Sequence, residues 1–498
     1  MVFPCFRKGC AIVLMALTTL AVDLETTLAQ VRNPELEALK KEIEELRRSD
    51  AEKQRKLDEL QRRIQAMESR PIAVEKPAAP QSALDQAVKE TQPPAPEPLT
   101  TDILSRRVGG TTFRLIDISL DALFAGGAST ERDASIRNLQ GGDHDPRRRG
   151  FTVQNVELSL AGAVDPYFTG EAHIIYLIDP EIGETRVELE EAFLTTQALP
   201  FGLQLKGGFY FTEFGIINQT HPHAWDWLDQ PVINSRLFGP DGLRQAGARL
   251  SWLTPLPWFS ELQFGVQNAN GETMASFLAN EEFFEERPIG GRPFVERDVR
   301  SAKDLLYLAR WENSWNLSDA VTTKLGFSGL FGPNASGPDG DTRIYGADFK
   351  LRWRPSDNFR GWPFVLWQSE VMNRDYRADR FFDDSDPDNV IDLPRETLRD
   401  WGFYTQALYG FSYGWAAGLR YEYATGSKES AIEGGRKADP FRDDRHRLSP
   451  LLAWHPSEFS RIRLQYNYDR ANHLERRDAH SIWLGVEFLY GGHPAHKY

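Results

Sequence analysis

A cluster of histidine, tryptophan and aspartate side chains occupies residues 221–229, which read His-Pro-His-Ala-Trp-Asp-Trp-Leu-Asp. Imidazole and carboxylate groups are ordinary zinc ligands, so this segment could bind zinc. The candidate ligands are His221, His223 and Asp226, with Asp229 as a further carboxylate. Two histidines two residues apart are a weak metal signature. A second interpretation is that the segment folds into a pore and forms a constriction of His221, His223, Trp225, Asp226 and Trp227. Plain packing of a loop is the third.

Charged side chains at alternate positions of strand-like segments form a second candidate group. If the apolar side of each strand faces lipid, the other side lines a water-filled lumen. The acidic candidates, on the earlier strands, are Glu157, Glu171, Glu188 and Glu190. The basic candidates, on later strands, are Arg249, Lys324, Lys350, Arg352, Arg420, Arg461 and Arg463. Acids and bases on different parts of one wall would bias the passage of ions. Alternatively, they are merely solvated or salt-bridged.

The elements that must position these residues are β-strands with two different faces. In residues 480–490, the positions Ile482, Leu484, Val486, Phe488 and Tyr490 share one face, while Ser481, Trp483, Gly485, Glu487 and Leu489 share the other. Similar segments recur back to residue 113. We expect about sixteen strands, at residues 113–124, 151–164, 167–178, 187–196, 203–210, 244–252, 260–268, 305–315, 320–331, 343–354, 363–375, 399–411, 413–424, 446–454, 460–469 and 480–490. Glu191, next to Glu190, breaks the alternation and indicates either a bulge or a phase error of one residue in this strand.

The links between these strands alternate in length. Short turns alternate with longer polar segments around residues 125–150, 211–243, 269–304, 376–398 and 425–445. Aromatic residues flank many strand ends, as in the interfacial girdles of membrane barrels. This pattern predicts an all-β transmembrane barrel of about sixteen antiparallel strands over residues 106–498. Residues 211–243 would be its third external loop.

Residues 1–105 have a different character. Residues 1–29 are typical of an export signal, with Arg7 and Lys8 before an apolar core at residues 11–22. Residues 30–70 carry a heptad repeat, which predicts an α-helical coiled coil that forms a trimeric stalk. Its core positions are Leu36, Leu39, Ile43, Leu46, Leu57, Leu60, Ile64 and Met67. The alternative is a helix lying against another protein. Residues 71–105 are rich in proline and alanine and predict an extended linker.

Composition narrows the function further. The net charge is −14, which argues against nucleic acid as a partner because phosphate binding needs a basic surface. The two cysteines, Cys5 and Cys10, both lie within the predicted signal, so the mature chain should hold neither a disulfide nor a thiolate metal site. We found no motif of an enzyme with the structural context that its chemistry needs, and we expect the protein not to be an enzyme.

Several segments resemble the phosphate-selective porin O/P family and its porin-like relatives. Residues 151–176, 187–194 and 203–209 look like early strands of that family. Residues 221–225 with Asp229-Gln230-Pro231, and residues 493–498, look like a porin-like group called zinc-regulated outer-membrane receptors. This resemblance implies an outer-membrane β-barrel.

Together, these patterns predict an outer-membrane porin of a Gram-negative-type bacterium that passes small hydrophilic solutes or ions by diffusion. Its expected partners are the lipid bilayer, lipopolysaccharide and two further copies of the chain, with the stalk in the periplasm. We expect no cofactor other than, in the first interpretation of residues 221–229, zinc. Two other functions stay open. One is a zinc-linked binding or uptake receptor, and the other is a structural protein that links the envelope, through its coiled coil, to a periplasmic or cell-wall partner.

Overall fold

The structure is a computed structural model, and it describes residues 105–108, 111–114, 116–179, 183–388, 390–427, 430–432, 435–437 and 439–491. The predicted export signal, the coiled coil, nearly all of the linker and the segment 493–498 lie outside the described residues. Most of the predicted barrel lies within them.

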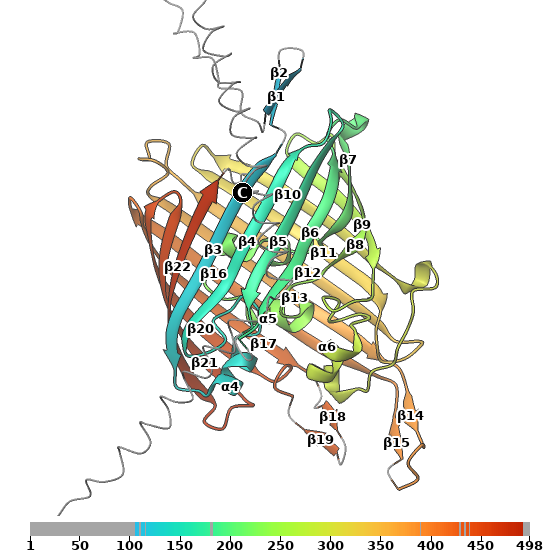
Figure 1. Cartoon of the computed structure of the whole chain (residues 1–498). Coiled ribbons are helices and arrows are strands. Elements are labelled where there is room, and N and C mark those ends of the chain that lie inside the picture. Colours follow the sequence, from blue (N-terminus) through green and yellow to red (C-terminus); the bar gives the residue numbers. More distant parts are fainter. Residues whose placement is uncertain are drawn as a thin grey trace, which may run out of the picture. The chain divides into compact units, whose positions relative to one another are not determined.

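Sixteen antiparallel strands close into one barrel (Figure 1). Along the chain they are β3 (Asp117–Ser129), β4 (Gly150–Ala163), β5 (Phe168–Ile178), β6 (Thr185–Thr196), β7 (Leu203–Phe211), β8 (Arg244–Leu253), β9 (Phe259–Asn268), β10 (Leu305–Ser318), β11 (Val321–Pro333), β12 (Asp341–Trp353), β13 (Phe364–Ala378), β16 (Glu396–Ser412), β17 (Trp415–Gly426), β20 (Arg445–Ser457), β21 (Ser460–Ala471) and β22 (Asp478–Gly491). The barrel closes where β22 pairs with β3.

The predicted barrel is therefore confirmed, and each expected strand overlaps an observed one. The first prediction was misplaced. Residues 111–114 form β2 (Thr111–Arg114), which pairs only with β1 (Ser105–Val108) in a separate hairpin. The first barrel strand starts at Asp117 and runs to Ser129, further than expected. Ala125, Gly126 and Gly127 resemble a turn in sequence, but they pair with β22 and β4.

The two faces of the strands meet different surroundings. On β22, Ile482, Leu484 and Phe488 are 44–48% exposed, whereas Trp483 is fully buried. The same alternation places apolar and aromatic side chains on the outside of other strands, among them Phe264, Trp311, Tyr345, Trp367 and Leu419. Because successive side chains point to opposite faces, the buried charged residues of these strands point inward. No helix among the described residues is both long enough and apolar enough to cross a bilayer.

Five of the links at one end of the barrel are long and carry their own structure. They contain the helices α4 (Asp133–Leu139), α5 (Val232–Phe238) and α6 (Glu281–Glu286), and the 3-10 helices η2 (Ile217–Gln219), η3 (Pro222–Ala224), η4 (Ile289–Gly291) and η5 (Ala302–Asp304). Two hairpins also extend from this end, β14 (Phe381–Asp383) with β15 (Ile391–Leu393), and β18 (Ser430–Ile432) with β19 (Gly435–Lys437). The links at the other end are short, apart from 354–363, and one holds η1 (Pro200–Gly202).

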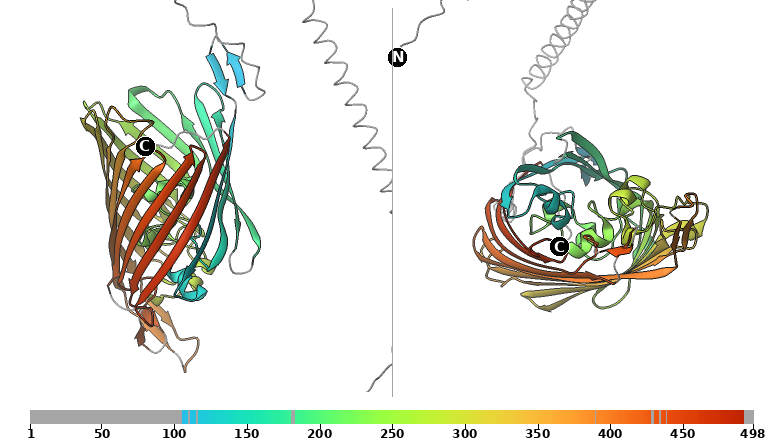
Figure 2. Two further views of the ribbon diagram at one scale, coloured as in Figure 1. Left: turned by 90° about the vertical axis from the view of Figure 1, so that its left-hand side faces the viewer. Right: turned by 90° about the horizontal axis from the view of Figure 1, so that it is seen from below.

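An apolar core lies inside the ring of strands. Phe214, Ile233 and Phe238 of the β7–β8 link are buried together with Leu308 of β10 and Tyr404 of β16. Figure 2, viewed along the barrel, shows the light-green helix α5 within the ring. The β7–β8 link, residues 212–243, is thus folded into the barrel, and we call it the third loop.

Candidate functional site

The third loop is attached to the wall where it leaves β7. Its Glu213 accepts a hydrogen bond from Arg249 of β8 and forms an ion pair with Lys206 of β7, at 2.8 Å. Gly215, at φ = 63°, then turns the chain toward β13. A side chain there would collide with the Glu370 carboxylate. That carboxylate accepts hydrogen bonds from the backbone N–H groups of Ile216 and Ile217, at 2.6 and 3.2 Å.

Asp229 attaches the middle of the loop to the opposite part of the wall. Its side chain is buried, and the carboxylate pairs with Arg447 at 2.9 Å and with Arg420. Further donors to it are Gln465 at 2.8 Å, Asn467 at 2.7 Å and Gln140 at 3.1 Å. Although burial opposes ionisation, the two guanidinium groups hold the pKa of Asp229 below its ordinary value.

The two tryptophans of the loop pack against the wall. Trp227 is 1% exposed and lies against Leu408, Ala416, Leu451 and Ala453. Its indole N–H donates to the carbonyl oxygen of Ser449, at 2.9 Å. The β20–β21 ladder skips the pairs of Ser449 and Pro450, a gap that fits the missing N–H of proline. Trp225 donates within the loop, to the Thr220 carbonyl at 2.8 Å.

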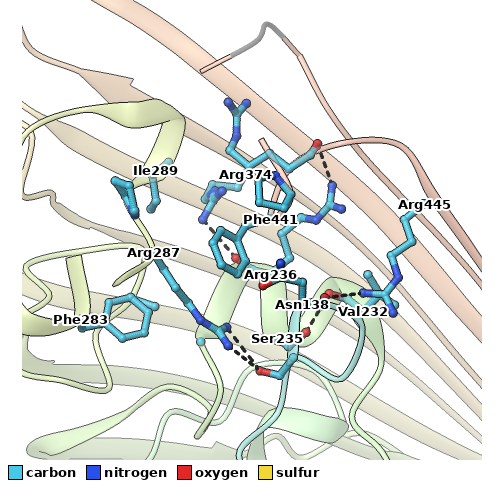
Figure 3. Close-up of a pocket in the computed structure, with 16 residues that line it drawn as sticks. Asn138, Val232, Ser235, Arg236, Phe283, Arg287, Ile289, Arg374, Phe441 and Arg445 are labelled. Atoms are coloured by element: carbon cyan, nitrogen blue, oxygen red, sulfur yellow. Dashed lines mark hydrogen bonds between the residues drawn. The ribbon is translucent and has the colours of Figure 1, made fainter. Parts of the chain in front are cut away.

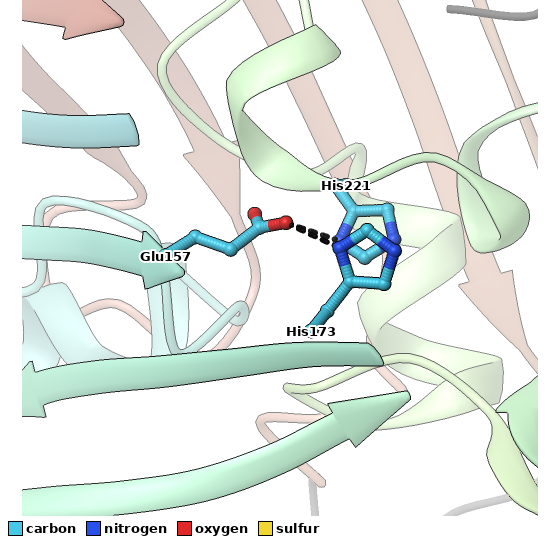
Figure 4. A group of neighbouring side chains, drawn as sticks. All are labelled: Glu157, His173 and His221. Atoms are coloured by element: carbon cyan, nitrogen blue, oxygen red, sulfur yellow. Dashed lines mark hydrogen bonds and ion pairs between the residues drawn. The ribbon is translucent and has the colours of Figure 1, made fainter. Parts of the chain in front are cut away.

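The two histidines of the loop meet carboxylates from β4 and β6 and a third histidine from β5. Figure 4 shows three of these residues, Glu157, His173 and His221. Nδ1 of His221 lies 3.4 Å from Glu157 Oε1 and 2.7 Å from Glu190 Oε2. Its Nε2 lies 2.8 Å from Glu191 Oε2. Nδ1 of His173 and Nδ1 of His223 each lie 2.8 Å from Glu157, on different oxygens. We call these six residues, Glu157, His173, Glu190, Glu191, His221 and His223, the histidine–glutamate cluster.

A β-bulge in β6 produces the acidic side of this cluster. His173 pairs with Glu191 and Ile174 with Leu189, so Glu190 has no partner on β5. Both Glu190 and Glu191 are consequently buried inside the barrel, at 1% and 6% exposure. The bulge predicted from the Glu190–Glu191 sequence is confirmed. It places one carboxylate on each side of the His221 ring.

The cluster has a strong electrostatic effect on the loop. Burial opposes the charged form of His221, but Glu190 and Glu157 outweigh it and hold its pKa well above the ordinary value. Burial and Glu157 act on His223 in the same way, and its pKa is also raised. The contacts of His221 and His223 with these carboxylates attach this end of the loop to β4 and β6.

The predicted lining residues point into the barrel, but most of them are paired. Arg249 pairs with Glu213, Lys324 with Glu312 at 3.1 Å, and Arg461 and Arg463 both with Glu487. Arg463 also donates to the carbonyl oxygens of Trp225 and Trp227. On the acidic side, Glu157 is fully buried, Glu188 pairs with Arg244, and the side chain of Glu171 is 38% exposed. Lys350 and Arg352 are half-buried on β12.

The structure groups the candidate metal ligands differently from the sequence prediction. Among the described residues, a set with metal-ligand spacing consists of Glu157, His173 and His221. Asp226 is not in this set. Its carboxylate is instead attracted electrostatically to three cations, Lys350, Arg461 and Arg463. His173 was missed, although its place two residues after Glu171 on a strand puts both on the inner face.

Arginines also surround a pocket at the long-loop end (Figure 3). Arg236, Arg287, Arg374, Arg442 and Arg445 line it, together with Phe283 and Phe441. Arg374 and Arg442 share the buried Asp400, and Arg445 pairs with Asp469. The sequence prediction did not include this pocket, because its residues come from five separate segments.

No family model matches this chain. It is 28% identical over 412 residues to an uncharacterized protein of Aquifex aeolicus (strain VF5), a match that covers 77% of this chain and 80% of the relative. Similar solved structures include the outer membrane channel DcaP of Acinetobacter baumannii, with a TM-score of 0.47 and 10% identity over 75% of this chain and 97% of that one. The anion-selective porin from Comamonas acidovorans has a TM-score of 0.44 and 8% identity over 75% of this chain and 100% of that one. Salmonella typhi OmpF, in complex with daunomycin, has a TM-score of 0.42 and 12% identity over 78% of this chain and 100% of that one. None of these similarities assigns the chain to a family, and the relation to phosphate-selective porins stays a prediction.

Proposed function

We propose that this protein is an outer-membrane porin that lets small hydrophilic solutes or ions diffuse through a charged lumen. One observation carries the proposal. The sixteen-stranded barrel is closed, its outer face is apolar and aromatic, and its inner face is charged. A closed barrel leaves no strand edge unpaired, and an apolar outer face fits lipid better than water.

The third loop supports the same proposal. It reaches from Glu370 on β13 to Glu157 on β4 and Asp229's partners on β17 and β20. A loop attached to the wall at several points would narrow the lumen permanently, without a conformational change. We infer that it sets the size limit for solutes.

Planar bilayers test the channel directly. Purified full-length protein should give discrete conductance steps, and these should scale with salt concentration as expected for a water-filled pore. Well-folded protein that inserts and gives no steps would overturn the proposal. Liposome swelling with sugars of increasing size would then measure the limit set by the third loop.

We also propose a homotrimer held by a coiled coil over residues 36–67, in contact with lipid and lipopolysaccharide. Support comes from the heptad repeat alone, since these residues lie outside the described part of the chain. Deleting residues 35–68 should convert trimers into monomers in analytical ultracentrifugation while the conductance steps persist. If the stalk instead links the envelope to a periplasmic or cell-wall partner, the deletion should alter envelope attachment. A zinc-linked binding role is a further proposal, favoured by the histidine–glutamate cluster.

A further inference from the structure

The histidine–glutamate cluster has a feature that a constriction loop does not require. Three potential ligand atoms converge at one point: Nδ1 of His173, Nδ1 of His221 and Oε1 of Glu157. Each of these three residues offers a ligand atom within 4.8 Å of the other two. Two imidazole nitrogens and a carboxylate oxygen are the ligand set of many zinc sites, in which ligand atoms surround the ion at about 2.0–2.2 Å.

We propose that Glu157, His173 and His221 form a binding site for a divalent transition-metal ion such as Zn²⁺, with Glu190 as the fourth ligand. Imidazole nitrogen favours Zn²⁺, Cu²⁺ or Ni²⁺ over Ca²⁺ and Mg²⁺, which take oxygen ligands. Asp226, a candidate in the sequence prediction, is replaced in this ligand set by His173 and two glutamates.

Glu190 provides an independent reason for the proposal. It is 1% exposed, and neither of its carboxylate oxygens has a hydrogen bond of good geometry among the described residues. Its Oε2 nevertheless lies 2.7 Å from Nδ1 of His221, so the carboxylate faces the same point as the three ligand atoms. A buried carboxylate without hydrogen bonds is costly unless a cation compensates it; protonated His221 is one such cation, and a metal ion bound between Glu190 and Nδ1 of His221 would be another. The bulge in β6 is what holds it there.

The groups behind the ligands also match a metal site. Metal-binding histidines usually donate their second ring N–H to a carboxylate, which fixes the tautomer and the ring orientation. Nε2 of His221 lies 2.8 Å from Glu191 Oε2, which leaves Nδ1 for the ion. Nε2 of His173 faces Glu171 at 3.9 Å, which is too long for a hydrogen bond. The second oxygen of Glu157 accepts a hydrogen bond from His223, at 2.8 Å.

An exposed carboxylate lies beside the buried ligands. The Glu171 side chain is 38% exposed, and its Oε2 is 3.9 Å from Nε2 of His173. We infer that a hydrated cation would meet Glu171 before the buried ligands. Because the site needs only the barrel and its third loop, it can be tested independently of any conductance.

Cobalt provides a direct test, because tetrahedral Co²⁺ absorbs visible light strongly. Untagged full-length protein in detergent should bind one Co²⁺ per chain with intense d–d bands, and one equivalent of Zn²⁺ should abolish them. His173→Ala and His221→Ala should each weaken binding by about tenfold or more. His446→Ala, which removes an exposed histidine hydrogen-bonded to Tyr421, should bind like the unaltered protein.

Two further measurements separate this site from the C-terminal histidines and from a failure of the variants to fold. His493→Ala combined with His496→Ala removes the C-terminal histidines and should leave binding unchanged. If a ligand variant fails to fold, as judged by circular dichroism, X-ray absorption of the unaltered protein with Zn²⁺ should show two imidazole ligands with oxygen neighbours. Absence of Co²⁺ bands in folded protein, unchanged affinity in folded His173→Ala and His221→Ala, or loss only in the C-terminal variant would each overturn the proposal.

Discussion

Asp229 of the third loop and Arg447 of β20 are 218 residues apart in the sequence, yet their side chains pair at 2.9 Å inside the barrel. Both are at most 1% exposed. Arg447 also pairs with Asp469 at 2.8 Å, and Asp229 also pairs with Arg420. A buried network of this kind is favourable only while every member has its partners, because each charge has lost its hydration. The position of the loop therefore depends on a few complete ion pairs.

Replacing Asp229 with alanine should release the loop. Arg420 would still pair with Glu422, and Arg447 would still pair with Asp469. Both arginines would lose their shared ion pair with the Asp229 carboxylate. Breaking a buried pair in this way costs about 3–5 kcal/mol. We expect a corresponding fall in the free energy of unfolding in urea, and larger, noisier conductance steps. Asp384→Ala, in an exposed hairpin link, is the matched control and should change neither. Unaltered steps in a folded Asp229→Ala barrel would show that the loop does not limit the pore.

The stability of the long-loop end should depend on pH through Asp241. Burial, and then repulsion from Asp143, raise the pKa of this carboxyl to about 7. The folded chain thus binds a proton that the unfolded chain, with an ordinary pKa of about 4, has already released. The contribution of Asp241 to the free energy of unfolding should be fully present below about pH 4. It should be lost as the pH rises to about 7. Urea midpoints measured across this range should show the fall.

Asp241→Asn is the control for that pH dependence. The amide has nearly the same shape but does not titrate, so the contribution of this site should disappear while the fold is kept. An identical slope in the Asn variant would assign the pH dependence to another group.

The barrel was predictable from the sequence because its signal is local. Every strand carries its own alternation, and an outward residue such as Leu484 must be apolar whatever its neighbours are. The C-terminal end of the first strand was not, since its glycines and alanines lack that contrast and are strand only through their pairing with β22 and β4. The bulge at Glu190 was visible as a break in the alternation. The contacts of the third loop were not visible, because the partners of His221 and Asp229 come from strands up to 238 residues away, as Asn467 shows. Nothing in the spacing of such residues specifies which part of the wall a loop will meet.

The apolar outer face can be tested by placing a charge on it. Leu484, 48% exposed on β22, lies opposite Leu464 of β21. If lipid covers this face, Leu484→Arg should destabilise the barrel by about 2–4 kcal/mol near the middle of the bilayer. Reversible folding into lipid vesicles, followed by tryptophan fluorescence, measures the loss. Ser385→Arg, in an exposed link, should have no such effect. Equal stabilities of the two variants would argue against a membrane location of this face.

Ion selectivity should respond to Glu171 more than to the buried acids. Glu157 is fully buried and its charge faces three histidines, whereas 38% of the Glu171 side chain is exposed. An accessible carboxylate raises the local concentration of cations, and a compensated one does so much less. Glu171→Gln should therefore shift the reversal potential in a salt gradient toward weaker cation preference, and Glu171→Lys should shift it further in the same direction. Glu458→Gln, in the exposed turn between β20 and β21, is the control of equal charge change. Equal shifts for Glu171→Gln and Glu458→Gln would mean that overall charge, and not this wall of the lumen, sets the preference.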